Sequence, residues 1–270
     1  MHYPFHKFLT IAKSVSALLL LLALILGLPS LYSFAAEDQQ EPVSAKDFIK
    51  SAVEKEQETL PNIQIKSSVT LFEDGIESRT FVVEIKIKPE SLGRVTITDS
   101  GVVKYEAIFF VEDDQGFERS GASEKWLPMP KGQRIDPKVG AWVDASFTAY
   151  SYLSNAIDYG QANFSFDSQE KVGQALCRKV KVVRTGGKNL YQLPQAFGIK
   201  DVDWKSEKFV ATYWIEEKTE HFIKIDATHQ FERIYRKNNY IIKVNMDFSH
   251  YGEDFDIEVP QEVQDLLKKE

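Results

Sequence analysis

Residues 209–260 read FVATYWIEEKTEHFIKIDATHQFERIYRKNNYIIKVNMDFSHYGEDFDIEVP. In four runs of this stretch apolar side chains alternate with polar ones, and short polar turns separate the runs. A period of two places every second side chain on one face of a strand, and it cannot keep a stripe on one side of a helix. The stretch therefore predicts four antiparallel strands with one dry face.

The last two runs show the alternation best. The longer one turns five apolar side chains the same way, namely Tyr240, Ile242, Val244, Met246 and Phe248. The final run places Phe255, Ile257 and Val259 on one side, with acidic residues between them. Pro260 has no N–H to donate to a strand ladder, so we expect the final strand to end there.

The end of the chain resembles the tail of the LolA and LppX/LprG families, which are exported bacterial carriers of lipoproteins or lipids. The resemblance rests on Tyr213-Trp214-Ile215 before a turn, on Phe248–Gly252, and on Ile257–Pro260. It covers roughly the last fifth of the chain closely, and the rest only in the order of the elements. It implies an α+β fold that is mainly antiparallel β: a curved half-barrel sheet with helices packed on its concave face.

The N-terminus has the pattern of an export signal. Two lysines precede an apolar run over 15–28, and small residues at 33–36 offer a cleavage site. We expect a signal peptide over 1–36, a flexible leader over 37–43 and a single domain over 44–270, in a periplasmic or other extracytoplasmic compartment. An uncleaved membrane anchor is the alternative interpretation.

Charge and cysteine content limit the classes of partner. The chain has a formal net charge of −7, and cleavage would make it −9 because residues 1–36 hold two lysines, no arginine and no acidic residue. Such an acidic chain has no general attraction for nucleic acid or an anionic membrane surface. Cys177 is the single cysteine. It cannot form an internal disulfide, and we expect a buried, unreactive thiol.

Three features organise the N-terminal two thirds of the domain. Ser44 and Asp47 predict a helix cap, and the turn residues at Asp74-Gly75 and 99–101 predict hairpins. The strand over Val102–Val111 is apolar on both faces, so a second element should cover its other side. The Gly-, Pro- and charge-rich stretch Asp113–Pro137 predicts a long loop.

A helix over about 139–159 is expected to follow this loop. Its apolar surface is wider than an ordinary stripe and includes Trp142, Tyr150 and Tyr152. We expect this helix to act as a lid over the concave face of the sheet. Candidate walls of an apolar cavity below it share an inward direction in the alternation: Val83, Ile85, Tyr105, Phe109, Tyr240, Ile242, Val244, Met246 and Phe248.

Catalytic patterns are missing from the sequence. It has no phosphate-binding Gly-rich loop, no Gly-x-Ser-x-Gly and no Cys-x-x-Cys, so we assign no catalytic residue, no metal ligand and no cofactor. His221 and His250 fall in turns, where we expect exposed side chains, and His229 lies in a predicted strand. An envelope hydrolase would require one of these histidines to cluster with carboxylates in a cleft.

The sequence therefore favours a binding protein that shelters the acyl chains of a lipid or an acylated protein during transport. An acyl chain gains about 0.8 kcal/mol per buried CH₂, or on the order of 10 kcal/mol for about 16 carbons before the cost of association. The alternative at each position is that these apolar side chains fill an ordinary packed core. A second function on the same fold is contact with another envelope protein, as an interaction or sensor domain.

Overall fold

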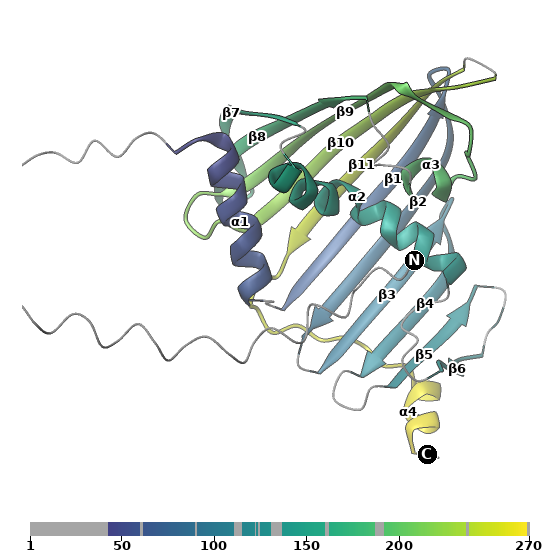
Figure 1. Cartoon of the computed structure of the whole chain (residues 1–270). Coiled ribbons are helices and arrows are strands. Elements are labelled where there is room, and N and C mark those ends of the chain that lie inside the picture. Colours follow the sequence, from purple (N-terminus) through teal and green to yellow (C-terminus); the bar gives the residue numbers. More distant parts are fainter. Residues whose placement is uncertain are drawn as a thin grey trace, which may run out of the picture. The chain divides into compact units, whose positions relative to one another are not determined.

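The alternating runs form one antiparallel sheet of eleven strands in the computed structural model (Figure 1). The structure describes residues 43–59, 62–89, 91–110, 115–121, 123, 125–130, 137–159, 162–186, 192–235 and 238–268. The strands are β1 (Ile63–Glu73), β2 (Ile76–Lys88), β3 (Leu92–Asp99), β4 (Val102–Phe110), β5 (Gln115–Ser120), β6 (Leu127–Pro128), β7 (Asn163–Val172), β8 (Ala175–Thr185), β9 (Val202–Glu216), β10 (Phe222–Arg233) and β11 (Asn239–Ser249). Their spatial order is β6-β5-β4-β3-β2-β1-β11-β10-β9-β8-β7.

The described residues also form four helices. They are α1 (Ala45–Thr59), α2 (Pro137–Tyr159), α3 (Gln192–Ala196) and α4 (Gln261–Leu267). Figure 1 shows α1, α2 and α3 over one face of the sheet, which curves around them, while α4 lies apart near β5 and β6. The predicted class, an open, mainly antiparallel sheet with helices on its concave face, is confirmed.

Local sequence signals account for the first helix and two hairpins. The backbone N–H of Asp47 donates to Ser44 Oγ at 3.1 Å, so the predicted cap is present. Both turn residues of the β1–β2 and β3–β4 hairpins have positive φ: 49° and 82° at Asp74-Gly75, and 52° and 79° at Ser100-Gly101. Two-residue turns with positive φ at both positions match the twist of the adjoining strands, which explains the tight hairpins.

The strand register aligns apolar side chains across the middle of the sheet. Six residues from six consecutive strands lie opposite one another in one row: Phe81, Val69, Val244, Ala227, Ala211 and Val182. All six are buried. Directly paired residues share a face of the sheet, so this row forms a continuous apolar floor beneath the helices.

The outer face of β3, β4 and β5 has a smaller core of its own. Ile108 and Phe117 are buried there together with Trp126 and Val263 of α4. The expectation that a second element covers the other side of Val102–Val111 is thus confirmed, and the cover is the C-terminal segment with the Trp126 segment. The part of Val102–Val111 that the structure describes as strand ends at Phe110.

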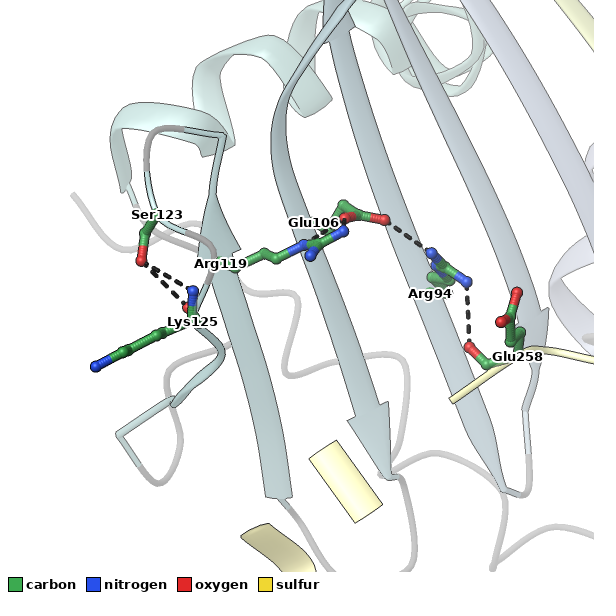
Figure 2. Close-up of polar contacts among 6 residues, drawn as sticks. All are labelled: Arg94, Glu106, Arg119, Ser123, Lys125 and Glu258. Atoms are coloured by element: carbon green, nitrogen blue, oxygen red, sulfur yellow. Dashed lines mark hydrogen bonds and ion pairs between the residues drawn. The ribbon is translucent and has the colours of Figure 1, made fainter. Parts of the chain in front are cut away.

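A buried ion cluster lies beside this outer core (Figure 2). Glu106 of β4 accepts hydrogen bonds from Arg94 of β3 at 2.7 Å and from Arg119 of β5 at 2.6 Å. Arg94 Nη1 also donates to the backbone oxygen of Glu258 at 3.1 Å. One carboxylate therefore links three strands, and one guanidinium links them to the C-terminal segment.

Two expectations from the sequence are wrong. The stretch Asp113–Pro137 is not one loop, because it contains β5 and β6, which extend the sheet beyond β4. Residues 253–260 keep the predicted burial pattern, with Ile257 buried between exposed Asp256 and Glu258, but they form no strand. Packing against the outer face can produce alternating burial in an extended segment without strand pairing.

Residues Pro42–Glu270 form one compact unit. The expected signal peptide over 1–36 and nearly all of the leader over 37–43 lie outside the described residues. Within the described part of the chain, no helix combines the length and the apolar character needed to cross a membrane.

Candidate functional site

The candidate site is the interface between α2 and the apolar floor of the sheet. All nine wall candidates lie on this face and belong to one hydrophobic cluster. Val83 of β2 pairs with Ile97 of β3, which pairs with Tyr105 of β4, so the face continues from the centre toward the β6 edge. Eight of the nine are buried, and Phe109 is partly buried.

Aromatic side chains of α2 make most of its specific contacts with the sheet. Trp142 stacks on Phe81 of β2, with ring centroids 5.6 Å apart. Tyr150 meets Phe222 of β10 edge-on at 5.5 Å. The structure therefore brings these two predicted lid residues together with the sheet face that the alternation indicated.

Tyr152 lies over another part of the same face. Its ring meets Phe209 of β9 at a centroid distance of 4.8 Å. Ala145, Ala149 and Ala156 are buried on the same helix, and such small side chains let the helix approach the strands closely. The aromatic side chains of this helix spread its contacts over β2, β9, β10 and β11.

Two hydrogen bonds fix the middle of α2. Tyr213 of β9 donates its hydroxyl to the backbone oxygen of Ala149 at 2.8 Å, and Ser67 of β1 donates to the backbone oxygen of Ser146 at 3.1 Å. Burial raises the pKa of Tyr213, as expected for a hydroxyl enclosed between sheet and helix. Both donors are fully buried, so each bond forms in an apolar environment where a missing partner would be costly.

A second contact region holds α1 against the ends of β10 and β11. Glu56 of α1 accepts a hydrogen bond from Tyr251 at 2.8 Å and another from the backbone N–H of Phe222 at 3.3 Å. His221 stacks on Tyr251, with ring centroids 4.3 Å apart. Burial raises the pKa of Glu56 and lowers that of His221.

The three histidines differ more than their sequence positions suggest. His250 is exposed, as predicted, and lies 2.7 Å from Glu253. The expectation that His221 is exposed is wrong, because its side chain is 19% accessible and packed under Tyr251. His229 is completely buried and faces Glu207 of β9, with Nε2 3.2 Å from Oε1.

Residues that the sequence analysis missed surround Phe209. Arg184 of β8 and His229 of β10 both pair with Phe209, and Glu207 precedes Phe209 by two positions in β9. All three polar residues are buried. The alternation itself could have indicated them, because Glu207 and Arg184 occupy inward positions next to Phe209 and Val182.

The described residues offer little for metal or thiol chemistry. No group of three or more His, Cys, Asp or Glu side chains suited to a metal ion occurs among the residues that the structure describes. Cys177 is buried, as predicted, and burial, followed by the nearby Glu216 carboxylate, raises the pKa of its thiol. A raised pKa keeps the thiol protonated and therefore a poor nucleophile.

No protein-family model matches this chain, and no curated protein matches it. Among solved structures it is similar to the Mycobacterium tuberculosis lipoprotein LppX, at 10% identity and a TM-score of 0.43, covering 79% of this chain and 98% of LppX. LprF from Mycobacterium bovis matches at 10% identity and a TM-score of 0.42, covering 80% and 96%. A LolA superfamily protein from Nitrosomonas europaea matches at 10% identity and 0.26, covering 82% and 97%. Each TM-score is below 0.5, so the function proposed next is derived from this chain's own residues.

Proposed function

We propose that this protein is a carrier that shelters acyl chains of a lipid or of a lipid-modified protein between α2 and the sheet. The observation that supports it most is the continuous apolar floor across six strands under a helix that presents Trp142, Tyr150 and Tyr152 to it. A face of this width offers hydrocarbon a long, uniform surface. The histidine–carboxylate pair on this face, His229 and Glu207, has completely buried side chains, so we propose binding rather than catalysis.

The nature of the helix contacts explains how a ligand could enter. Apolar contacts are non-directional, so an acyl chain inserted between Phe81 or Phe222 and the helix would replace one apolar surface by another. The hydrogen bonds of Tyr213 and Ser67 are the directional contacts that a displaced helix would lose. Each such bond contributes about 1 kcal/mol net, which is small beside the roughly 10 kcal/mol from burying a long acyl chain.

Extraction of the protein from its native host tests this proposal. The protein should be purified without detergent, extracted with organic solvent and analysed by mass spectrometry. We expect one class of acylated compound in amounts comparable to the protein, and none from a control protein purified in parallel. An extract without acylated compounds, together with no uptake of a fluorescent fatty acid by the purified protein, would contradict the proposal.

A second candidate function is docking to another envelope protein, and one observation favours it. The β1–β2, β3–β4 and β10–β11 hairpins point to the same end of the sheet because of the strand order. Large apolar side chains are exposed at these turns: Ile76, Val102, Ile234 and Tyr235. Exposed apolar clusters often mark protein contacts. Replacing Ile234 and Tyr235 by serine should abolish capture of a partner from envelope extract while leaving acyl binding intact.

A further inference from the structure

A buried polar cluster lies inside the helix-covered face, around the ring of Phe209. It consists of Tyr152 of α2, Arg184 of β8, Glu207 of β9 and His229 of β10, and none of the four is more than 6% exposed. Glu207 and His229 are in contact at 3.2 Å, and the Arg184 guanidinium lies 5.6 Å from the centre of the Tyr152 ring. Four elements thus bring polar side chains to one place in an otherwise apolar core.

The hydrogen-bonding capacity of this cluster is largely unused. Arg184 forms a hydrogen bond to Tyr152, and Glu207 lies 3.2 Å from His229, but within the described residues no well-aligned partner is found for the Tyr152 hydroxyl, Arg184 Nη1, both Glu207 oxygens or both His229 nitrogens. These are six of the eight such buried side-chain atoms. Buried polar groups are normally paired, and a half-satisfied network is less favourable than an apolar core. Six such atoms at one point together offer a binding position for a polar group.

The backbone next to the cluster is irregular in a way that fits a binding position. Lys208 pairs with Gln230 and Asp203 with Glu232, so the four residues 204–207 of β9 stand opposite the single residue Phe231. Bulges of this kind redirect side chains and are common beside functional sites. Glu207 is the last residue of this bulge, which places its carboxylate against His229.

The chemistry of the four side chains limits what the occupant can be. Arg184 and Tyr152 offer N–H and O–H donors, Glu207 offers two oxygens, and His229 offers two ring nitrogens. The formal charges of Arg184 and Glu207 cancel, so the cluster has no strong preference for an anion or a cation. A hydroxyl group both donates and accepts, so several neighbouring hydroxyls would satisfy this mixture best.

Aromatic rings connect the cluster to the proposed apolar walls. His229 lies 5.0 Å from the ring of Phe231, which stacks on Tyr240 at 5.6 Å. Tyr152 itself belongs to the lid helix. We infer that the cluster is the polar end of the ligand site and receives an uncharged head group with several hydroxyls, of the glycerol or sugar type. The inference rests on the proposed function, because an acyl chain on the apolar floor would carry this head group.

Two esters of the same acid test the inference. Monopalmitoylglycerol carries two free hydroxyls and methyl palmitate carries none, and each should compete with a fluorescent acyl probe for the native protein in detergent-free buffer. We expect the glycerol ester to bind about tenfold more tightly, as two or three hydrogen bonds to buried groups would give. The Tyr152→Phe variant should lose about threefold to tenfold of the affinity for the glycerol ester and keep that for the methyl ester.

The outcomes separate the inference from the proposed function. Equal affinities of the native protein for both esters would contradict the inferred head-group site but not the proposed acyl binding. Binding of neither ester would contradict both. A structure of the complex that shows nothing but ordered water between Arg184, Glu207 and His229 would also overturn the inference. Tyr235→Phe removes a hydroxyl from an 83% exposed tyrosine and should change neither affinity. The comparison of the esters on the native protein stands even if Tyr152→Phe does not fold.

Discussion

Glu106 is the residue whose substitution should affect stability through charge alone. Its side chain is 5% exposed, and it accepts hydrogen bonds from Arg94 and Arg119. Glu106→Gln keeps the shape but leaves two guanidinium groups without a carboxylate. Because both arginines are partly exposed, we expect a loss of about 1–3 kcal/mol in the free energy of unfolding, measured by urea denaturation. Glu84→Gln, which breaks the exposed pair with Lys66, is the control and should cost less than about 1 kcal/mol.

The same residue should make stability depend on acid pH. Burial opposes the ionisation of Glu106, but the hydrogen bonds from Arg94 and Arg119 outweigh it and lower its pKa. The unfolded chain therefore takes up this proton at a higher pH than the folded protein does. The contribution of Glu106 is present above about pH 4.3, the ordinary glutamate value, and is lost as pH falls through the lower folded value. The difference between native protein and Glu106→Gln should shrink in that range, and a constant difference would contradict the assignment.

Glu56 should show the opposite dependence. Burial raises its pKa, although hydrogen bonds from Tyr251 and Phe222 lower it in part. The folded state thus holds the proton more tightly, and its stability falls as pH rises from the ordinary glutamate pKa through the raised one. Glu56→Gln cannot ionise, and its amide oxygen can still accept both bonds. In urea unfolding the variant should gain stability relative to the native protein as the pH rises from the ordinary glutamate pKa through the raised one. If the variant instead becomes less stable relative to the native protein as the pH rises, the pKa of Glu56 is not raised.

At the scale of elements, α4 is a small helix with a large packing role. Val263 is completely buried against Ile108, Phe117 and Trp126 on the outer face. Val263→Ala should lower the free energy of unfolding by about 1–3 kcal/mol, since it removes two buried methyl groups and leaves a cavity. Asp265→Ala on the exposed side of the same helix is the matched control and should change it by less than about 0.5 kcal/mol. An equal effect of both substitutions would mean that α4 is not anchored by its apolar side chain.

Local chemistry determined which elements could be predicted from the sequence. The alternation in β1, β2 and β11, the Asp74-Gly75 turn and the Ser44 cap each depend on residues close together in the chain, and the structure has all of them. The extended segment around Ile257 looked like a strand because burial against a sheet also produces alternation. The short strands β5 and β6 were missed because β5 is held by pairing with β4 and β6 by pairing with β5, and pairing is not visible in a Gly- and Pro-rich segment.

The same distinction between local sequence signals and long-range pairing applies to the candidate site. The walls and the lid residues share a face because the period of strand and helix alone orients them. The cluster around Phe209 depends on pairing between three strands and on the bulge in β9, so the sequence does not show that its polar residues meet. Sequence indicates which side chains turn inward, but long-range register decides which polar ones meet.

For the molecule as a whole, acyl binding between sheet and helix requires α2 to separate from the floor. A disulfide between β1 and α2 would prevent this. Ser67 and Ser146 are the positions to exchange because both are buried and Ser67 Oγ lies 3.1 Å from the backbone oxygen of Ser146, and the native Cys177 is buried elsewhere in β8. In the Ser67→Cys/Ser146→Cys variant, oxidation should slow uptake of a fluorescent fatty acid at least about tenfold, and reduction should restore it.

The controls decide what such a result means. Each single cysteine variant should take up the fatty acid equally well under oxidising and reducing conditions, and free-thiol titration should confirm that the disulfide forms in the double variant. If the oxidised double variant takes up ligand as fast as the reduced one, α2 does not move away from the sheet centre during entry. The ligand would then have to enter past Tyr152 or Trp142, where the helix meets the floor through aromatic rings alone. Replacing Trp142 by alanine would in that case accelerate uptake, whereas with a lifting helix it should mainly weaken retention, seen as a faster off-rate.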